Sequence, residues 1–416
     1  MRHSLLCGVK SFEKMPGKIS GPRSEKADVS AIKIPILDLK PQYQAIKEEI
    51  RTAVDDVLES GQFILGATVK AFESEVADYL GVKHAIGVNS GTDALIIALR
   101  ALGIGPGDEV ITTSFSFFAT GESISNVGAQ PVFVDIQRGS FNLDPSLIEA
   151  VITPKTKAIM PVHLYGNPAA MAQIADIAAK HDLKIIEDCA QAFGTVYKGD
   201  CCGCAQSCND ATRESLLGKR AGALGDMGAF SFFPTKNLGA YGDGGLITTD
   251  DDGLAELAKM LRVHGAKKKY HNEMLGYNSR LDALQAAILR VKLAYIDTWN
   301  QQRRQVAKTY SQMLEGTDGV IVPELTDGHV FHQYTVRILD GKRDAVKQSL
   351  AEAGVSSMIY YPFPQDLLPV YKGQHPANPV SDELGAEVLS LPMWPELSVE
   401  TSERVTTALK SSLASL

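Results

Sequence analysis

The sequence predicts an α/β fold with a mainly parallel central sheet in a large domain, followed by a smaller α+β domain. Between about residues 34 and 290, short runs of β-branched residues alternate with stretches of helical spacing, which is the pattern of βαβ units. The chain has 416 residues, more than a single compact core usually reaches, so a second domain is expected. New strand and helix signals begin after about residue 320, which places the smaller domain at the C-terminus.

The strand candidates of the large domain are short and contain many Val and Ile residues, as buried parallel strands do. They comprise His84 to Val88, Glu109 to Thr112, Pro131 to Val134, Ala158 to Val162 and Lys184 to Glu187. Small and apolar residues at helical spacing predict helices over Thr92 to Leu102 and Ala169 to Lys180. A further apolar face predicts a long helix that leads into the second domain, and it consists of Leu281, Leu284, Ile288 and Val291.

The second domain is expected to hold a strand within Val330 to Ile338, a helix over Arg343 to Ala353 and a proline-rich loop around Tyr361 to Pro369. We therefore assign residues 31–300 to the large domain and residues 301–416 to the small C-terminal domain. Residues 1–30 are polar and lack periodicity, so they are expected to form a mobile N-terminal extension.

The composition indicates a folded, soluble protein, because hydrophobic residues make up 44% and charged residues 22% of the chain. The net charge of −8 argues against nucleic acid as a partner, since binding to a phosphate backbone needs a basic face. No run of about 18 apolar residues is present, so no membrane-spanning helix is expected. The apolar stretch from Leu5 to Val9 is too short for a secretory signal, which favours a cytoplasmic protein over one with a transit peptide.

The first motif with chemical meaning is Ser90-Gly91-Thr92, which follows a predicted strand and opens a predicted helix. Backbone N–H groups at a helix start, a glycine that permits close approach and a threonine hydroxyl together suit a phosphate dianion. The alternative is an ordinary helix N-cap, for which serine and threonine are common.

The second motif is the buried-type strand that ends in Glu187 and Asp188. Ligands of an open parallel sheet gather at the carboxyl ends of its strands, so Asp188 is expected beside a cofactor. A carboxylate against a pyridine nitrogen keeps that nitrogen protonated. The alternative is an acidic residue that caps the next segment.

The third motif is Lys236, which lies among apolar residues and before a glycine-rich turn. A lysine in such surroundings can have a lowered pKa and form an imine with an aldehyde, whereas most lysines are solvated surface charges. The order of the three motifs along the chain favours an imine-forming lysine over a solvated surface lysine.

These segments resemble the signatures of the DegT/DnrJ/EryC1/StrS sugar aminotransferases, which are fold-type I enzymes that depend on pyridoxal 5'-phosphate (PLP). The similar segments read SGTDAL, SFFATGESISNVGAQPVFVDI, IEDCAQAFG, GAFSFFPTKNLGAYGDGG and GYNSRLDALQAAIL. They occur in the order of the family, from about residue 34 to the C-terminus. Within the family, GQFILG, FNLDPSLIEAVITPKTKAI and HGAKKKYHNEMLGYNSRLD look closest to aminotransferases for UDP-2-acetamido-2-deoxy-3-oxo-glucuronate.

The resemblance implies roles for individual residues around the cofactor. Lys236 would bind PLP as an imine, Asp188 would contact the pyridine nitrogen, and Gln191 would lie near the phenolic oxygen. Phe117 would stack on the ring. The phosphate would be bound by Gly91, Thr92, Ser231 and, from a second subunit, Asn278. The last of these roles implies a homodimer with shared active sites.

On the sugar side, the resemblance points to Gly61, Phe63, Thr235, Arg280, Tyr360 and Tyr361. Arg280 also makes chemical sense, since glutamate and a uronic acid both present carboxylates that suit a bidentate guanidinium. A structural ion pair is the alternative for Arg280. The chain departs from its relatives at three of the positions compared, with Phe63 in place of Tyr, Tyr360 in place of His, and Asp366 in place of His.

Residues 200–218 interrupt a stretch that is continuous in relatives, and we expect an inserted surface loop there. This segment contains Cys201, Cys202, Cys204 and Cys208. A metal site is the alternative, but a zinc-type pair of CxxC motifs is absent, so no metal is predicted. The basic run Lys267 to Lys269 is either a solvated turn or an aid in attracting a nucleotide diphosphate.

The predicted function is the PLP-dependent transfer of an amino group from L-glutamate to a nucleotide-linked keto-sugar, for cell-envelope polysaccharide synthesis. One alternative is an aminotransferase for another keto-sugar, acting at C4 or on a dTDP-linked substrate. A dehydratase of the same fold would have His in place of Lys236. A non-catalytic sensor that binds PLP or a sugar nucleotide is the third alternative.

Overall fold

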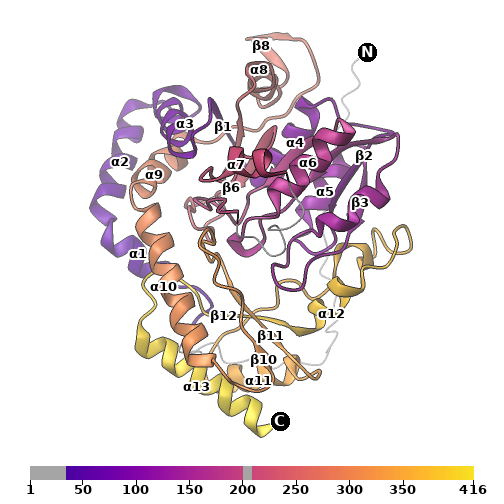
Figure 1. The fold of residues 1–416 in the computed structure, drawn as a ribbon. Helices are drawn as coiled ribbons and strands as arrows, with labels where there is room; N and C mark the ends of the chain where they lie inside the picture. The colour runs from indigo at the N-terminus through magenta and orange to yellow at the C-terminus, as the bar shows by residue number, and fades with distance from the viewer. Residues whose placement is uncertain (1–33, 200–208) are drawn as a thin grey trace, which may run out of the picture.

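The computed structural model describes residues 34–199 and 209–416 (Figure 1). Its centre is a seven-stranded sheet with the order β1-β7-β6-β5-β4-β2-β3. The strands are β1 (His84–Val88), β2 (Glu109–Thr113), β3 (Gln130–Val134), β4 (Thr156–Met160), β5 (Lys184–Asp188), β6 (Met227–Ser231) and β7 (Gly245–Thr249). Strand β7 is antiparallel to both of its neighbours, and the other pairs are parallel. The predicted α/β fold with a mainly parallel sheet is therefore confirmed.

Adjacent residues of each strand point to opposite sides of the sheet. Both faces therefore carry apolar side chains, and helices cover both. In β5, Ile186 packs in one core with α4 (Gly91–Ala101), α5 (Ala119–Asn126) and α8 (Asp252–Leu261). Its neighbour Ile185 packs in another core with α6 (Met171–His181) and α7 (Asp210–Leu216). Beside the second core, Phe230 of β6 packs with α2 (Lys47–Ser60), α3 (Gly66–Leu80) and α9 (Ala283–Leu293).

A smaller antiparallel sheet lies toward the C-terminus, with the order β10-β11-β12. Its strands are β10 (Val320–Ile321), β11 (Tyr334–Ile338) and β12 (Val388–Leu391). Its core includes residues of α11 (Arg343–Glu352) and α13 (Val399–Ser415), which lie at the lower end of Figure 1. The remaining elements are α1 (Lys40–Ala45), α12 (Pro379–Glu387), the hairpin of β8 (Ala266–Lys268) and β9 (His271–Asn272), and short 3-10 helices at Pro145–Leu147, Glu149–Val151, Leu164–Gly166 and Gln365–Leu367.

The helix that leads toward the small sheet differs from the prediction. The apolar face from Leu281 to Val291 belongs mainly to α9, which ends at Leu293, and the connection is made by α10 (Ile296–Leu314). Trp299 of α10 packs with the core of α2, α3 and α9, whereas Tyr310 packs with the core of the small sheet. One helix therefore contributes to both cores, which a periodic pattern within α9 alone does not reveal.

The C-terminal strand and the insertion also differ from expectation in their details. The expected strand from Val330 to Ile338 begins only at Tyr334, because the backbone N–H of Val330 bonds instead to Gly166 of the large domain. Within the expected inserted loop, residues 210–216 form helix α7, whose buried Leu216 packs against the sheet. The expected mobile extension at residues 1–30 and the cysteines at 201, 202, 204 and 208 lie outside the described residues. Among the described residues, no helix is long and apolar enough to span a membrane. The division at residue 300 remains a prediction.

Candidate active site

The carboxyl ends of β1, β5 and β6 meet at one edge of the sheet, as expected for a ligand site in an open α/β sheet. Strand β7 connects two of these ends, since Gly245 pairs with Val88 of β1 and with Ser231 of β6. Asp188 is the last residue of β5, the neighbour of β6. The three predicted motifs are therefore brought together by the sheet.

The helix start at Gly91 forms a close contact with Ser231. A Cβ atom added at Gly91 would lie 2.7 Å from Cβ of Ser231, and one added at Gly245 would lie 2.3 Å from the carbonyl oxygen of Ser90. Only glycine allows the three backbone segments to approach this closely. Ser90 accepts a hydrogen bond from the backbone N–H of Asp93 at 3.1 Å, so the N-cap alternative also holds. The amides of the first turn beyond this cap have no helical partner and point toward an anion position.

Lys236 lies in the turn after β6. Its backbone N–H donates to the carbonyl oxygen of Phe233 at 2.8 Å. The turn is tight, because a Cβ atom at Gly239 would lie 2.4 Å from the carbonyl oxygen of Pro234. Burial lowers the pKa of Lys236 to about 8, and the negative charge of Asp188 opposes this shift. Such an amine is partly neutral near neutral pH and suits imine formation.

Asp188 is a buried carboxyl group with a donor at each oxygen. The hydroxyl of Thr120 donates to Oδ2 at 2.8 Å, and the backbone N–H of Ala190 donates to Oδ1 at 3.1 Å. Burial raises the pKa of Asp188, while these two hydrogen bonds and the positive charge of Lys236 act against that shift. The bond to Ala190 is the local capping interaction of the alternative interpretation, and each carboxylate oxygen can still accept a further donor.

Aromatic residues and Gln191 complete this side of the site. Gln191 accepts from the backbone N–H of Tyr165 at 2.6 Å and donates to the hydroxyl of Tyr361 at 3.0 Å. The ring centroids of Phe117 and Tyr361 are 6.2 Å apart, and Phe117 is 59% exposed, so Tyr361 leaves much of Phe117 uncovered. Thr235 and Tyr360 line a small adjoining cavity of about 70 Å³.

Comparison with known proteins matches residues 44–410 to the DegT/DnrJ/EryC1/StrS aminotransferase family. The chain belongs to this family. It is a sugar aminotransferase, and its cofactor is pyridoxal phosphate. The resemblance that the sequence motifs carry is thereby confirmed, together with the reaction class.

The relatives of the aminotransferase match this chain over nearly their whole length. A pleiotropic regulatory protein of Geobacillus stearothermophilus is 50% identical over 89% of this chain and 96% of its own. The UDP-2-acetamido-2-deoxy-3-oxo-D-glucuronate aminotransferase of Pseudomonas aeruginosa is 43% identical over 90% of this chain and 99% of its own. The crystal structure of DesV from S. venezuelae is similar with a TM-score of 0.84 and 42% identity, covering 91% of this chain and 98% of that chain. This similarity confirms the fold-type I prediction.

The residues of the aminotransferase fit the cofactor on structural grounds. The glycines at positions 91 and 245 let the start of α4 pack directly against the end of β6, which brings Ser231 beside the amides of the first turn, and this arrangement of donors suits the phosphate group. The amine of Lys236 and the carboxyl of Asp188 influence each other's pKa, so the two groups lie in the same part of the site, as the amine and the carboxylate for a PLP ring must.

A second group of predicted residues lies around another cavity of the chain. Asn278 and Arg280 line a cavity of about 410 Å³ together with Ile64. The neighbouring loop carries Gly61 and Phe63, and it is fixed to this place because the carbonyl oxygen of Phe63 accepts from the backbone N–H of residue 283 at 2.9 Å. No hydrogen bond or ion pair among the described residues joins this group to Lys236 or Asp188. Arg280 has no ion-pair partner in the described part of the chain, which contradicts the alternative of a structural ion pair.

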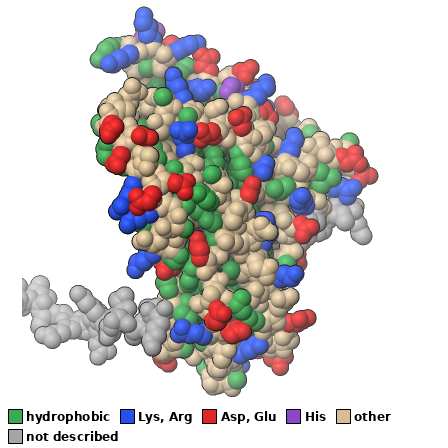
Figure 2. Space-filling view, turned by 90° about the vertical axis from the view of Figure 1, so that its left-hand side faces the viewer, with side chains coloured by type: hydrophobic (Ala, Val, Ile, Leu, Met, Phe, Trp, Pro, Cys, Tyr) green, Lys and Arg blue, Asp and Glu red, His purple; other side chains and the backbone are tan. Residues whose placement is uncertain are grey.

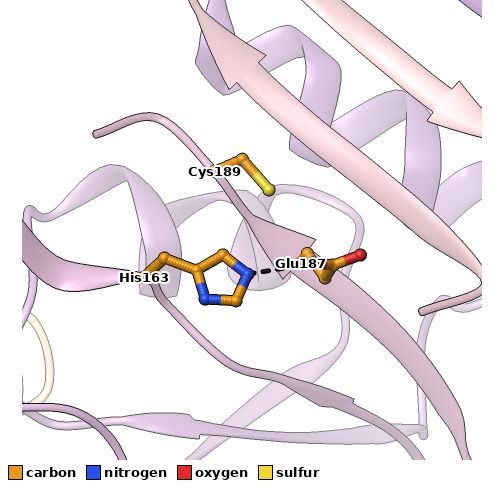
Figure 3. Close-up of side chains that lie close together, drawn as sticks. All are labelled: His163, Glu187 and Cys189. Atoms are coloured by element: carbon orange, nitrogen blue, oxygen red, sulfur yellow. Dashed lines mark hydrogen bonds and ion pairs between the residues drawn. The ribbon is translucent and has the colours of Figure 1, made fainter. Parts of the chain in front are cut away.

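Behind Asp188 lies a buried network that the sequence analysis missed (Figure 3). The backbone N–H of residue 169 donates to Nδ1 of His163 at 3.0 Å, so Nε2 carries the hydrogen and donates to Glu187 at 2.9 Å. Glu187 also accepts three backbone N–H groups, from Gly222, Leu224 and Gly225. Together with Cys189 these side chains have the spacing of a metal site, but a metal ion would have to displace bonds that already use both ring nitrogens and both carboxylate oxygens.

Three residues near the site were missed for different reasons. His163 follows β4 at the same sheet edge, so the rule that selected Asp188 also applies to it. Thr120 lies three positions after Phe117 and was not distinguished from other helix residues. His332, whose pKa is lowered well below its usual range mainly by burial and also by the charge of Lys236, comes from the distant C-terminal part of the chain, where no local signal marks it.

Proposed function

We propose that this aminotransferase moves the amino group of L-glutamate onto a nucleotide-linked keto-sugar, and that the substrate is UDP-2-acetamido-2-deoxy-3-oxo-glucuronate. The observation that carries the proposal is the position of Lys236, an amine with a lowered pKa near a buried carboxylate, in the turn that follows the packed contact between β6 and the start of α4. We assign the reaction to the cytoplasm and to the synthesis of cell-envelope polysaccharide.

In this proposal, Lys236 is the catalytic residue. When bound, PLP supplies an aldehyde that accepts the amino group and a protonated ring that stabilises negative charge on the substrate carbon. The Nζ atom of Lys236 binds the cofactor, is released when glutamate binds, and takes the proton from Cα of glutamate. After 2-oxoglutarate leaves and the keto-sugar enters, the same atom delivers a proton to the sugar carbon that gains the nitrogen.

The other residues bind and orient. Asp188 keeps the ring nitrogen protonated, Gln191 contacts the phenolic oxygen, and Phe117 covers one ring face. Gly91, Thr92 and Ser231 hold the phosphate, which prevents the ring from turning away from Lys236.

The reaction is tested with Lys236→Ala. This variant should lose the visible absorbance of lysine-bound PLP and lose turnover measured as 2-oxoglutarate formation, because no other amine replaces it. Lys410→Ala, which removes an exposed lysine of α13, is the matched control and should retain both. Turnover at the wild-type rate by the Lys236 variant would refute the assignment.

The sugar is the less constrained part of the proposal. Relatives whose names specify a substrate act on UDP-, dTDP- and GDP-linked sugars. A free guanidinium at Arg280 supports a carboxylate on the sugar, and a bidentate Arg pair with a uronate would add selectivity. Gly61, Phe63, Thr235, Tyr360 and Tyr361 are the other proposed sugar contacts.

A panel of keto-sugars with mass spectrometry of the product decides between the candidates. If the uronate is the substrate, Arg280→Gln should lower kcat/KM for it by about tenfold to a hundredfold and leave a neutral keto-sugar much less affected. Preference of the wild-type enzyme for a neutral or dTDP-linked sugar would support the alternative aminotransferase activity.

We further propose a homodimer in which each active site receives Asn278 and Arg280 from the partner. The cavity lined by Asn278 and Arg280 shares no lining residue with the cavity lined by Thr235 and Tyr360, which supports this arrangement. The same region exposes large apolar side chains, with Leu58 52%, Phe63 45% and Ile64 52% exposed. Figure 2 shows hydrophobic side chains gathered in a band along the side of the molecule that carries α2 and α3. Such a band is typical of a protein interface.

Complementation tests the shared site. Lys236→Ala and Asn278→Ala should each be inactive or strongly impaired, whereas their co-expressed mixture should regain activity, because one site of the mixed dimer holds both wild-type residues. Light scattering gives the oligomeric state, and a monomer with full activity would contradict the proposal.

A regulatory role is the second candidate, and the 50% identical relative that is described as a regulatory protein favours it. A sensor would bind PLP or a sugar nucleotide without turnover. The amine of Lys236 has no use in such a protein beyond binding, so steady-state transamination of any keto-sugar in the panel would exclude a purely sensory function.

A further inference from the structure

We propose that Thr120 is a positioning residue that, together with Ser116, holds Asp188 in its ionised form and aims it at the cofactor ring. The inference rests on the proposed role of Asp188 and adds two residues that none of the sequence motifs assigned to the site. It is carried by a chain of hydrogen bonds from Ser116 through Thr120 to Asp188.

The direction of each bond in this chain follows from the number of hydrogens available. The hydroxyl of Thr120 donates to Oδ2 of Asp188 at 2.8 Å, and the hydroxyl oxygens of Ser116 and Thr120 are 2.9 Å apart. A hydroxyl has one hydrogen, and that of Thr120 is used, so Ser116 donates to Thr120. Asp188 therefore accepts at Oδ2 from a hydroxyl that is itself polarised by a second hydroxyl.

All three residues of this hydrogen-bond chain are buried, which makes its hydrogen bonds important. The exposed fractions are 4% for Ser116, 1% for Thr120 and 5% for Asp188. With the backbone N–H of Ala190 on Oδ1, both carboxylate oxygens accept protein donors. Protonation at Oδ1 would oppose the backbone N–H of Ala190, and protonation at Oδ2 would require both hydroxyls of the chain to reverse, so the arrangement favours the charged acceptor that a protonated ring nitrogen needs.

The segment that carries Thr120 is itself held in place from two sides. Gln365 donates its backbone N–H to the carbonyl oxygen of Ser114 at 2.7 Å and accepts from the backbone N–H of Gly121 at 3.1 Å. A Cβ atom at Gly121 would lie 2.5 Å from Oε1 of Gln365 and 2.9 Å from the ring of Phe133. The first turn of α5 therefore has little freedom to move Thr120 away from Asp188.

The alternative is that Thr120 only fills space, and substitutions separate the two roles. Thr120→Val keeps the shape and removes the hydroxyl, Thr120→Ser keeps the hydroxyl, and Ser116→Ala removes only the second bond. Thr112→Val is the matched control, since Thr112 is also buried and donates to the carbonyl oxygen of Met160 at 2.8 Å, without a bond to Asp188.

The readout is the affinity of the full-length apoenzyme for two probes, PLP and an analogue in which carbon replaces the ring nitrogen. Both probes keep the aldehyde and phosphate. Wild-type protein should bind PLP more tightly than the analogue. Thr120→Val should weaken PLP binding by about tenfold while leaving the analogue nearly unchanged, as expected for one bond to a buried charged group. Thr120→Ser should restore the difference, and Thr112→Val should not alter it.

Each outcome has a separate meaning. If wild-type protein binds both probes equally, the proposed role of Asp188 fails. If wild-type protein distinguishes them and Thr120→Val weakens both equally, Thr120 has only a packing role and the inference is overturned. If circular dichroism shows that Thr120→Val does not fold, Ser116→Ala tests the inference instead. A smaller loss of affinity that is confined to PLP would support the hydrogen-bond chain. An unchanged ratio of the two affinities would refute it.

Discussion

Lys236 and Lys292 are two lysines with a similarly lowered pKa but different surroundings. Burial lowers the pKa of each to about 8. Lys292 is 1% exposed, donates to the carbonyl oxygen of Gly239 and lies 4.6 Å from the ring centroid of Tyr241. It is thus held under the turn that carries Lys236. We infer that Lys236 is available to a ligand and that Lys292 is not.

The pKa of Lys292 predicts a pH-dependent stability. Its folded pKa of about 8 lies below the ordinary 10.5, so between these values the unfolded chain binds more protons and the free energy of unfolding rises with pH. The contribution is about 3 kcal/mol across this window. Lys292→Met should flatten that rise relative to wild type in urea unfolding followed at several pH values. An unchanged slope would show that Lys292 does not titrate in this range.

The pKa of Lys236 predicts the pH dependence of cofactor uptake. The neutral amine is the nucleophile, so the rate at which the apoenzyme gains the absorbance of lysine-bound PLP should rise with pH and level off above about 8. Stopped-flow absorbance measures this rate. A profile that levels off only near 10.5, the ordinary value, would mean that the surroundings do not lower the pKa.

At the element scale, the close approach of α4 to the end of β6 determines the phosphate site. Helix α4 starts at Gly91, directly after β1, and β6 ends at Ser231. The sequence predicted β1 and α4 with small errors at their ends, because each has a clear apolar pattern and the helix has an N-cap at Ser90, but it did not predict β6. The contact between their ends depends on the strand order, in which β7 separates β1 from β6.

Gly91→Ala tests that contact. The added Cβ would lie 2.7 Å from Cβ and 3.1 Å from Cα of Ser231, so backbone must shift and the phosphate amides move. We expect a loss of about 1–3 kcal/mol in the free energy of unfolding and a weaker affinity for PLP. Gly105→Ala, whose Cβ would meet only the carbonyl oxygen of Val127 at 3.7 Å, is the control and should behave like wild type. Equal effects of the two changes would contradict the close-contact explanation.

At the scale of the whole molecule, the C-terminal part of the chain is tied to the active-site edge of the large sheet. Asp135, which follows β3, accepts from the backbone N–H groups of Val380 and Ser381, both at 2.8 Å, and from the hydroxyl of Ser381 at 2.6 Å. These bonds hold the start of α12 beside β3. The segment between Tyr360 and Gln365 is thereby placed over Gln191 and α5.

Asp135→Ala should therefore destabilise the whole molecule. The change leaves buried donors without an acceptor and should lower the free energy of unfolding by about 3 kcal/mol in chemical denaturation. Asp144→Ala removes a comparable carboxylate that caps a short 3-10 helix through Ser146, and it should cost about 1 kcal/mol or less. A loss at Asp135 no larger than at Asp144 would show that this tie contributes little.

The sequence by itself determined the order and type of the main elements, the strand ends at which Ser90 and Asp188 lie, and the lysine that follows β6. These features are local, since apolar periodicity and capping residues act within a few positions of the chain. The break between α9 and α10, the helix within the insertion and the late start of β11 were not foreseen, because tertiary contacts override propensity there.

Only the tertiary structure decided which side chains act together. Thr120 reaches Asp188, which lies 68 positions away in the sequence. His332 comes near Lys236, which lies 96 positions away. The same packing places Asn278 and Arg280 in a cavity that shares no lining residue with that of Thr235, although the chain brings them only about 40 positions after Lys236. The physical reason is that strand order and the packing of α10 against both cores set distances in space, and no short stretch of sequence encodes them.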